Sequence, residues 1–410
     1  MTVERRASAP AVAVNLWYRV GSQHEAPGRT GLAHLFEHLM FQGSAHAKAG
    51  EHDALLQPLG AMFNASTHID HTEYWEVVPT EALDLALWLE ADRMGGLLEA
   101  LDQASLDNQR DVVKNERLQT MDNVPYGTAF EWLTSVTFGA GHPYHHLPIG
   151  SMADLDAVTL TDAQEFFSRF YRPSNAFLTL VGDVEPELAL SSAERYFGGI
   201  PAQPPVVFDH GAAESAGPVT HPQRRVVDQE PVPMPQVMRC WRAPADGMPE
   251  CDALELALSV LTEGASSRLM ERLVRKDDLA GGVDGGVLRL KDGNSIATLT
   301  AFAHNGVDPA RCEAIIDAEI ARLAADGPTE AELRRVKARL EHNHLREAEA
   351  VAGRAEALSR SICLFDDVDR ADQYLDRMRA VDGEQISAAA RKWLDPQAAN
   401  TIVYVPGGSY

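Results

Sequence analysis

Cysteine, long apolar runs and positive charge are all scarce in this sequence. The four cysteines of the 410-residue chain are scattered, and none has the close spacing of a metal-binding pair or a disulfide framework. No apolar run approaches the roughly 20 residues that cross a bilayer, and the N-terminus lacks the apolar centre of a secretory signal. The formal net charge of −24 argues against nucleic acid or an anionic membrane as the main partner. We expect a soluble protein of bacterial type, either cytoplasmic or periplasmic.

Apolar residues, by contrast, make up 45% of the chain, enough for two domains with cores of their own. A stretch rich in proline and glycine divides the chain nearly in half. The ends of the two halves, residues 159–184 and 381–407, share the order of a helix, a proline and an apolar strand. We therefore predict an α+β protein of two homologous domains, 1–200 and 231–410, joined by a linker at 201–230. Each is expected to be a mixed β-sheet packed with helices, related to the other by internal duplication.

The first half contains the pattern HLFEH, which begins at His34 within a predicted helix over residues 31–41. Residues four apart lie on one face of a helix, so the imidazoles of His34 and His38 can bind one ion. Glu37 stands at the edge of that face, where it can reach a water beside the ion without being a ligand. This H-x-x-E-H arrangement predicts a zinc hydrolase with Glu37 as general base. The matching part of the second half, LALSVLTEGAS, has no histidine, so the fold itself does not need these residues.

A catalytic zinc ion needs a third protein ligand from another part of the chain. Glu116 is one candidate, because it lies on a second predicted helix over residues 104–121. The spacing leaves other acids and histidines open as well: Asp111, His68, His71, His142, His145 and His146. The last three belong to the stretch GHPYHHLPIG, which is more typical of a loop than of a second metal site.

Several segments together resemble one family of enzymes. HLFEH, NASTHIDHTEYWEVVP, DVVKNER, NVPYG and HPYHHLPIGSMADLDAVTLTDAQEFFSRFYRPSNAFLTLVGDV are similar to the pitrilysin, or mitochondrial processing peptidase, family of zinc peptidases. The resemblance covers essentially the whole chain and is strongest over residues 18–185. It implies that Glu116 is the third ligand and that each chain binds one Zn²⁺. The family commonly has a further glutamate seven residues before that ligand. Gln109 stands there instead, able to hydrogen-bond near the ligands but adding no negative charge.

The resemblance also implies how a peptide binds. In such enzymes the substrate lies as an added strand along an exposed sheet edge, which corresponds here to residues 63–67, with Asn64 and Ala65 closest to the metal. Active family members use an arginine and a tyrosine from the second type of domain. Val274 and Gly281 occupy the corresponding positions here. The resemblance therefore implies the zinc-bearing subunit of a heterodimer, whose homologous partner supplies the Arg–Tyr pair, with a homodimer as the other option.

We accordingly predict a zinc-dependent metalloendopeptidase that hydrolyses oligopeptides or unfolded segments. Two alternatives stay open. The chain could be a non-catalytic structural subunit of the same family, like the core proteins of a respiratory complex, although such chains usually lose motif residues. It could also hydrolyse a bond other than a peptide, but an exposed edge strand gives a small substrate no advantage. Cleavage preference does not follow from the sequence.

Overall fold

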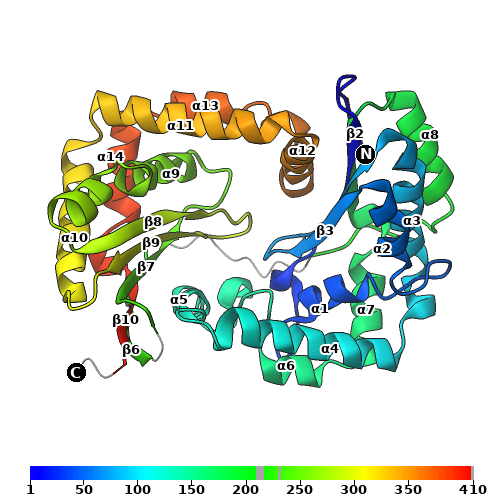
Figure 1. Cartoon of the computed structure of the whole chain (residues 1–410), viewed down its shortest axis with the longest axis horizontal. Helices are drawn as coiled ribbons and strands as arrows, with labels where there is room; N and C mark the ends of the chain where they lie inside the picture. The colour runs from blue at the N-terminus through cyan, green and yellow to red at the C-terminus, as the bar shows by residue number, and fades with distance from the viewer. Residues whose placement is uncertain (209–216, 230–231, 408–410) are drawn as a thin grey trace. The chain divides into compact units, whose positions relative to one another are not determined.

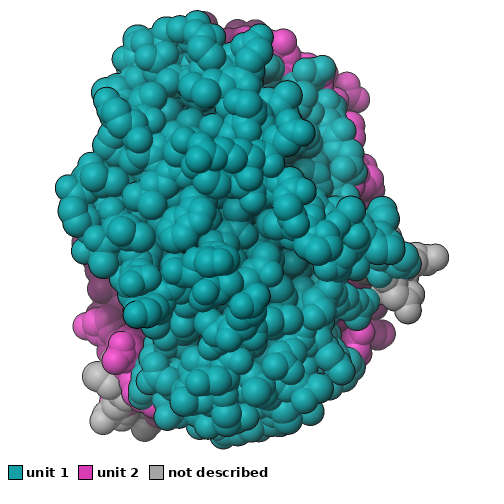
Figure 2. All heavy atoms as spheres, turned by 90° about the vertical axis from the view of Figure 1, so that its right-hand side faces the viewer, with its two compact units in different colours: residues 1–117, 146–209, 344–372 teal, residues 118–145, 210–343, 373–410 magenta. Residues whose placement is uncertain are grey.

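The computed structural model describes residues 1–208, 217–229 and 232–407. These residues fold into two units, which Figure 2 draws in two colours. Unit 1 consists of residues 1–117, 146–209 and 344–372, and unit 2 of the remaining segments. Each unit is a mixed sheet packed with helices, so the predicted α+β class is confirmed. Among the helices that the structure describes, none is both long and apolar enough to cross a membrane.

The sheet of unit 1 has the strand order β1-β5-β2-β4-β3. Its strands are β1 (Thr2–Arg5), β2 (Ala11–Tyr18), β3 (Met62–Thr67), β4 (Thr72–Pro79) and β5 (Ala176–Gly182). Strand β1 runs parallel to β5, and the other pairs are antiparallel. The apolar run AVAVNLWY forms β2 at the centre, where both faces are covered. Strand β3 pairs only with β4 and forms an edge of the sheet (Figure 1).

The helices of unit 1 surround the motif segment. The main ones are α1 (Leu32–Leu39), α2 (Glu51–Leu56), α3 (Leu83–Ala100), α4 (Gln103–Arg117), α6 (Met152–Ala157), α7 (Leu160–Phe170), α8 (Pro186–Phe197) and α12 (Val351–Phe365). Helix α1 contacts β3, α4 and α7, whereas α12 packs against β2 and β5. The motif helix is thereby held between the sheet edge and α4.

The sheet of unit 2 has the order β6-β10-β7-β9-β8, which repeats that of unit 1. Its strands are β6 (Arg224–Gln229), β7 (Gln236–Ala243), β8 (Ala280–Leu288), β9 (Ser295–Ala303) and β10 (Asn400–Pro406). Strand β6 is again parallel to its neighbour β10, and the other pairs are antiparallel. The helices that pack in this unit are α5 (Ala129–Thr137), α9 (Pro249–Thr262), α10 (Pro309–Asp326), α13 (Tyr374–Ala380), α14 (Gly383–Trp393) and most of α11 (Glu330–Glu349), whose Val336 is buried in the core. The repeated topology agrees with an internal duplication.

The two units exchange segments. Helix α5, from the first half of the sequence, packs on β7 and β10 of unit 2, and α12, from the second half, packs on β2 and β5 of unit 1. The packed units contain segments from both halves of the sequence, so they cross the predicted boundaries 1–200 and 231–410. These boundaries remain a proposal about the extent of the two duplicated repeats. The predicted linker 201–230 also contains β6, since its residues pair with β10. Positions 209–216 and 230 of that linker lie outside the described residues.

Candidate metal centre

Helix α1 separates its apolar and polar side chains onto two faces. Its buried apolar residues recur at the helical period: Leu32, Ala33, Leu35, Phe36 and Leu39. This packing leaves His34, Glu37 and His38 together on the other face. The predicted helix over residues 31–41 thus forms, and the two imidazoles stand one turn apart with ring centroids separated by 4.8 Å.

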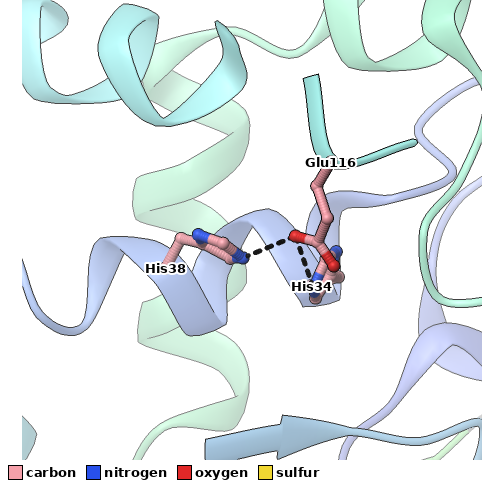
Figure 3. A group of neighbouring side chains, drawn as sticks. All are labelled: His34, His38 and Glu116. Carbon is pink, nitrogen blue, oxygen red and sulfur yellow. Dashed lines mark ion pairs between the residues drawn. The ribbon is translucent and has the colours of Figure 1, made fainter. Parts of the chain in front are cut away.

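Helix α4 brings Glu116 to this face. The Oε2 atom of Glu116 lies 3.4 Å from Nε2 of His38 and 3.7 Å from Nε2 of His34 (Figure 3). Both separations exceed an ordinary N–H···O hydrogen bond. Ligand atoms that each lie 2.0–2.1 Å from a tetrahedral zinc ion are about 3.3 Å apart. The two distances to Glu116 are close to this spacing, and all three ligand atoms lie within 4.8 Å of one another, so the donor set fits the ion that the motif predicts.

The local environment also favours the forms that bind a metal. Burial lowers the pKa of His34, which Glu116 raises in part, so this imidazole is neutral at pH 7 with a free lone pair. The nearby His38 ring has the largest effect on Glu116 and lowers the pKa of its carboxyl group. A neutral imidazole at His34 and a carboxylate at Glu116 suit a divalent cation.

Glu37 lies beside this group but outside it. Its Oε2 atom accepts a hydrogen bond from the Thr67 hydroxyl on β3 at 2.6 Å. Burial raises the pKa of Glu37, and the bond from Thr67 lowers it in part. A carboxylate that is fixed next to the ligands, with a pKa above its usual value, has the properties of a general base. Sequence reasoning did not single out Thr67, because no local pattern connects it to the motif helix.

The remaining predicted residues fall on the elements expected for them. Asn64 and Ala65 lie on the edge strand β3, where Asn64 is exposed and its Oδ1 atom accepts a hydrogen bond from the Ala65 backbone N–H at 2.9 Å. Gln109 is buried on α4, two turns before Glu116. No substrate or metal contact of these three residues is defined by the structure, so their roles remain proposals.

The structure separates the other candidate ligands from the group. Asp111 is exposed on α4. His68 and His71 stack in the turn between β3 and β4, where the His71 ring also stacks on Trp17 at 4.1 Å. His146 pairs with Glu25 instead. In the described part of the chain, no group of potential metal ligands includes these residues, nor His142 and His145. His145 ends a short 3-10 helix, Pro143–His145, and His142 directly precedes it.

The sequence did not predict a second group of potential metal ligands. His52, Glu76 and Glu90 bring potential ligand atoms within 4.8 Å of one another, and all three residues are buried. Arg93 binds Glu90 in two places, one of them an Nε–Oε2 bond of 2.8 Å, and lies 3.7 Å from Glu76. The guanidinium already supplies the positive charge that these carboxylates need. We interpret this group as a buried ion-pair network.

Comparison with known proteins identifies the family of this chain. Residues 1–145 match the family described as Insulinase (Peptidase family M16), and residues 157–340 match the Peptidase M16 inactive domain. The zinc protease PqqE of Helicobacter pylori is 31% identical over 331 residues, which are 80% of this chain and 72% of that protein. The chain belongs to peptidase family M16. The resemblance to pitrilysin-type zinc peptidases is thereby confirmed, with a first half of catalytic type and a second of inactive type.

Solved structures share the fold of this chain. A protease from Helicobacter pylori superimposes with a TM-score of 0.90 at 26% identity, covering 98% of this chain and 97% of that one. Two others show likeness of fold alone. A chain of complex III2 from Candida albicans has a TM-score of 0.79 at 12% identity over 98% and 93% of the two chains. The periplasmic protease PqqL from Escherichia coli has a TM-score of 0.77 at 17% identity, and 97% of this M16 chain covers 45% of PqqL.

Proposed function

We propose that this M16 chain is a zinc-dependent metalloendopeptidase whose ion is held by His34, His38 and Glu116. The single observation that carries the proposal is the convergence of three ligand atoms from α1 and α4 at nearly tetrahedral spacing, with Glu37 beside them but outside the set. Bound zinc would lower the pKa of a water molecule and polarise the peptide carbonyl.

Glu37 then serves as the proton carrier of the reaction. It takes a proton from the attacking water and passes it to the nitrogen of the departing amine. The Thr67 hydroxyl fixes the carboxylate during both transfers, since it donates a hydrogen bond to its Oε2 atom. Gln109 is proposed to hydrogen-bond close to the ligands without adding charge to them.

The substrate is proposed to be an extended peptide that adds to β3 as a further strand. This edge pairs on one side only, and it carries both Thr67 and the proposed contact residues Asn64 and Ala65. Main-chain pairing tolerates many sequences but requires an extended chain. Oligopeptides and unfolded segments satisfy that requirement, whereas a folded domain does not.

We further propose that a homologous partner subunit completes the enzyme. Val274 lies in the π-helix Met270–Lys276, and the exposed Gly281 lies in β8. Neither can replace the arginine and tyrosine that active relatives are expected to carry there. The match to about half of PqqL supports a pair of such units as the working assembly. A heterodimer is favoured because a second copy of this chain would also lack the Arg–Tyr pair.

Replacing Glu37 with glutamine tests the proposal. Glu37→Gln should retain about one zinc ion per chain and lose on the order of 10²- to 10⁴-fold in kcat toward an unstructured peptide. Glu99→Gln, an exposed change of the same chemistry in α3, is the matched control and should leave both quantities unchanged. Full turnover by Glu37→Gln would exclude Glu37 as the base.

The alternative is a structural subunit, which the fold shared with the Candida complex III chain supports. Metal analysis of the chain purified from its native source separates the two functions. A zinc-free chain that co-purifies in a large assembly without peptidase activity would favour the structural function, and one zinc per chain with activity favours the enzyme.

A further inference from the structure

The N-terminus of α1 has no cap of its own. Its first turn follows Gly31, whose φ of 92° places it in the left-handed region and which has no side chain to accept a hydrogen bond. The backbone N–H groups of a first turn need partners from elsewhere. Glu25 supplies them: its Oε2 accepts from the Gly31 N–H at 3.0 Å and its Oε1 from the Ala33 N–H at 2.7 Å. Ala33 directly precedes the first metal ligand.

A histidine from a distant part of the chain holds this carboxylate in place. The Nε2 atom of His146 lies 2.7 Å from Oε2 of Glu25 and 3.1 Å from the carbonyl oxygen of Ser22. Both neighbours accept hydrogen bonds, so Nε2 carries a proton and donates. The Glu25 side chain is fully buried, whereas 20% of the His146 side chain is exposed. Of the three hydrogen bonds to Glu25 described here, two come from backbone N–H groups and one from the His146 side chain. Removing His146 would leave the Glu25 carboxylate with the two backbone donors.

The segment that begins at His146 packs closely against the same helix end. A Cβ atom added at Gly150 would lie 2.3 Å from the Gly31 backbone nitrogen, too close for any other residue to fit. The Thr30 hydroxyl donates to Asp154 at 2.5 Å, and Ser151 donates its backbone N–H to Thr30. Residues 146–158 therefore bind the start of α1 by side-chain and backbone contacts.

The same segment also binds the helix that carries the third ligand. Arg117, next to Glu116, donates from Nη1 to the Gly150 carbonyl at 2.6 Å. Arg110, two turns earlier on α4, donates to the carbonyl oxygens of Leu155 at 2.9 Å and Val158 at 2.6 Å. Figure 1 shows α1, α4 and α6 adjacent in this unit, in agreement with their contacts. Residues 146–158 thus join the two ligand-bearing helices.

We infer that Glu25 and His146 are positioning residues of the metal centre, which hold the start of α1 against residues 146–158 so that His34 and His38 face Glu116. This inference rests on the proposed zinc site. Its consequence is that a change at His146, a residue outside the ligand set, alters metal affinity and the geometry around the ion.

The test measures Co²⁺ and Zn²⁺ binding to the full chain by chelator competition, together with the visible absorption spectrum of bound Co²⁺. His146→Leu should weaken binding on the order of 10- to 100-fold and change the Co²⁺ spectrum. His146→Gln keeps an N–H donor at a similar reach and should recover much of the affinity. A merely structural role of His146 would lower thermal stability without changing the spectrum of the folded protein.

His46 provides a closely matched control. Its Nδ1 atom lies 2.6 Å from Asp92, a carboxylate that also accepts two backbone N–H bonds, from His46 and Ala47. Those N–H groups belong to a loop rather than to α1, so His46→Leu should bind both metals as the unaltered chain does.

Three results would overturn the inference. If His146→Leu has wild-type metal affinity and an unchanged Co²⁺ spectrum, the inference about Glu25 and His146 is overturned, whereas the proposed zinc site is unaffected. If His146→Leu does not fold, Glu25→Gln decides, and unaltered metal affinity with an unchanged Co²⁺ spectrum in that variant would overturn the inference. Failure of the unaltered chain to bind either metal would refute the proposed function and this inference together.

Discussion

Replacing Thr67 with valine tests how Glu37 is prepared for proton transfer. The Thr67 hydroxyl lies 2.6 Å from the Glu37 carboxylate, the length of a strong charge-assisted hydrogen bond. Valine keeps the shape and the β-branching of threonine, so β3 should retain its pairing with β4. Hydrogen bonds to charged groups contribute about 1.5–3 kcal/mol. If that interaction orients the base in the transition state, its loss corresponds to a decrease of about 10- to 140-fold in kcat.

The assay compares kcat, KM and bound zinc for the unaltered chain and Thr67→Val, using a fluorogenic unstructured peptide and the assembly with the highest activity. We expect kcat to fall while zinc content and KM change little, because Thr67 is not part of the ligand group. Thr67→Ser restores the hydroxyl and is expected to recover most of kcat. Wild-type kcat in Thr67→Val would refute the reasoning, as would a Thr67→Ser variant that retains zinc but is equally slow.

Three further predictions address the ligands and the stability of unit 2. Glu116→Gln should weaken zinc binding by more than the roughly 10- to 100-fold typical of residues around the ligands, and equilibrium dialysis should show no change for the exposed Asp111→Asn on the same helix. Gln109→Glu adds a negative charge near the ligands and should tighten zinc binding by up to about tenfold in the same experiment. Weaker zinc binding would contradict the proposed position of Gln109 close to the ligands. Burial raises the pKa of Glu332, but the interactions with Arg268 and the hydrogen bonds from Thr329 outweigh burial and lower the pKa to about 2. The pKa of Glu332 in the folded chain lies below its ordinary value of 4.5, so the ion pair with Arg268 stabilises unit 2 fully above about pH 4.5. The contribution to the free energy of unfolding, about 1–2 kcal/mol after solvent screening, is lost as the pH falls toward 2. Denaturant unfolding at pH 7 and pH 3 should show this loss, and Glu332→Gln should make the difference smaller.

Much of the site could be predicted from the local sequence, because helix geometry alone determines which nearby residues share a face. The apolar spacing of Leu32, Leu35 and Leu39 assigns one side of α1 to the core, and His34 and His38 must then stand together on the other. The apolar run at 11–18 likewise predicts a central strand wherever the sheet is placed. The repeated helix–proline–strand endings indicated an internal duplication. The two sheets agree with it, because their strands follow the same order.

Tertiary packing decided what joins the motif to the rest of the chain. Spacing left Asp111 and five histidines open as candidates beside Glu116, and the family resemblance, rather than any periodicity, singled out Glu116. Its approach to the imidazoles depends on α4 packing against α1, and residues 146–158 bind both helices. The roles of Thr67, Glu25 and His146 had no local signal, since each acts through a contact with a residue far away in the sequence. The exchange of α5 and α12 between the units follows from the same cause: which helix covers a sheet is determined by the packed fold, not by position along the chain.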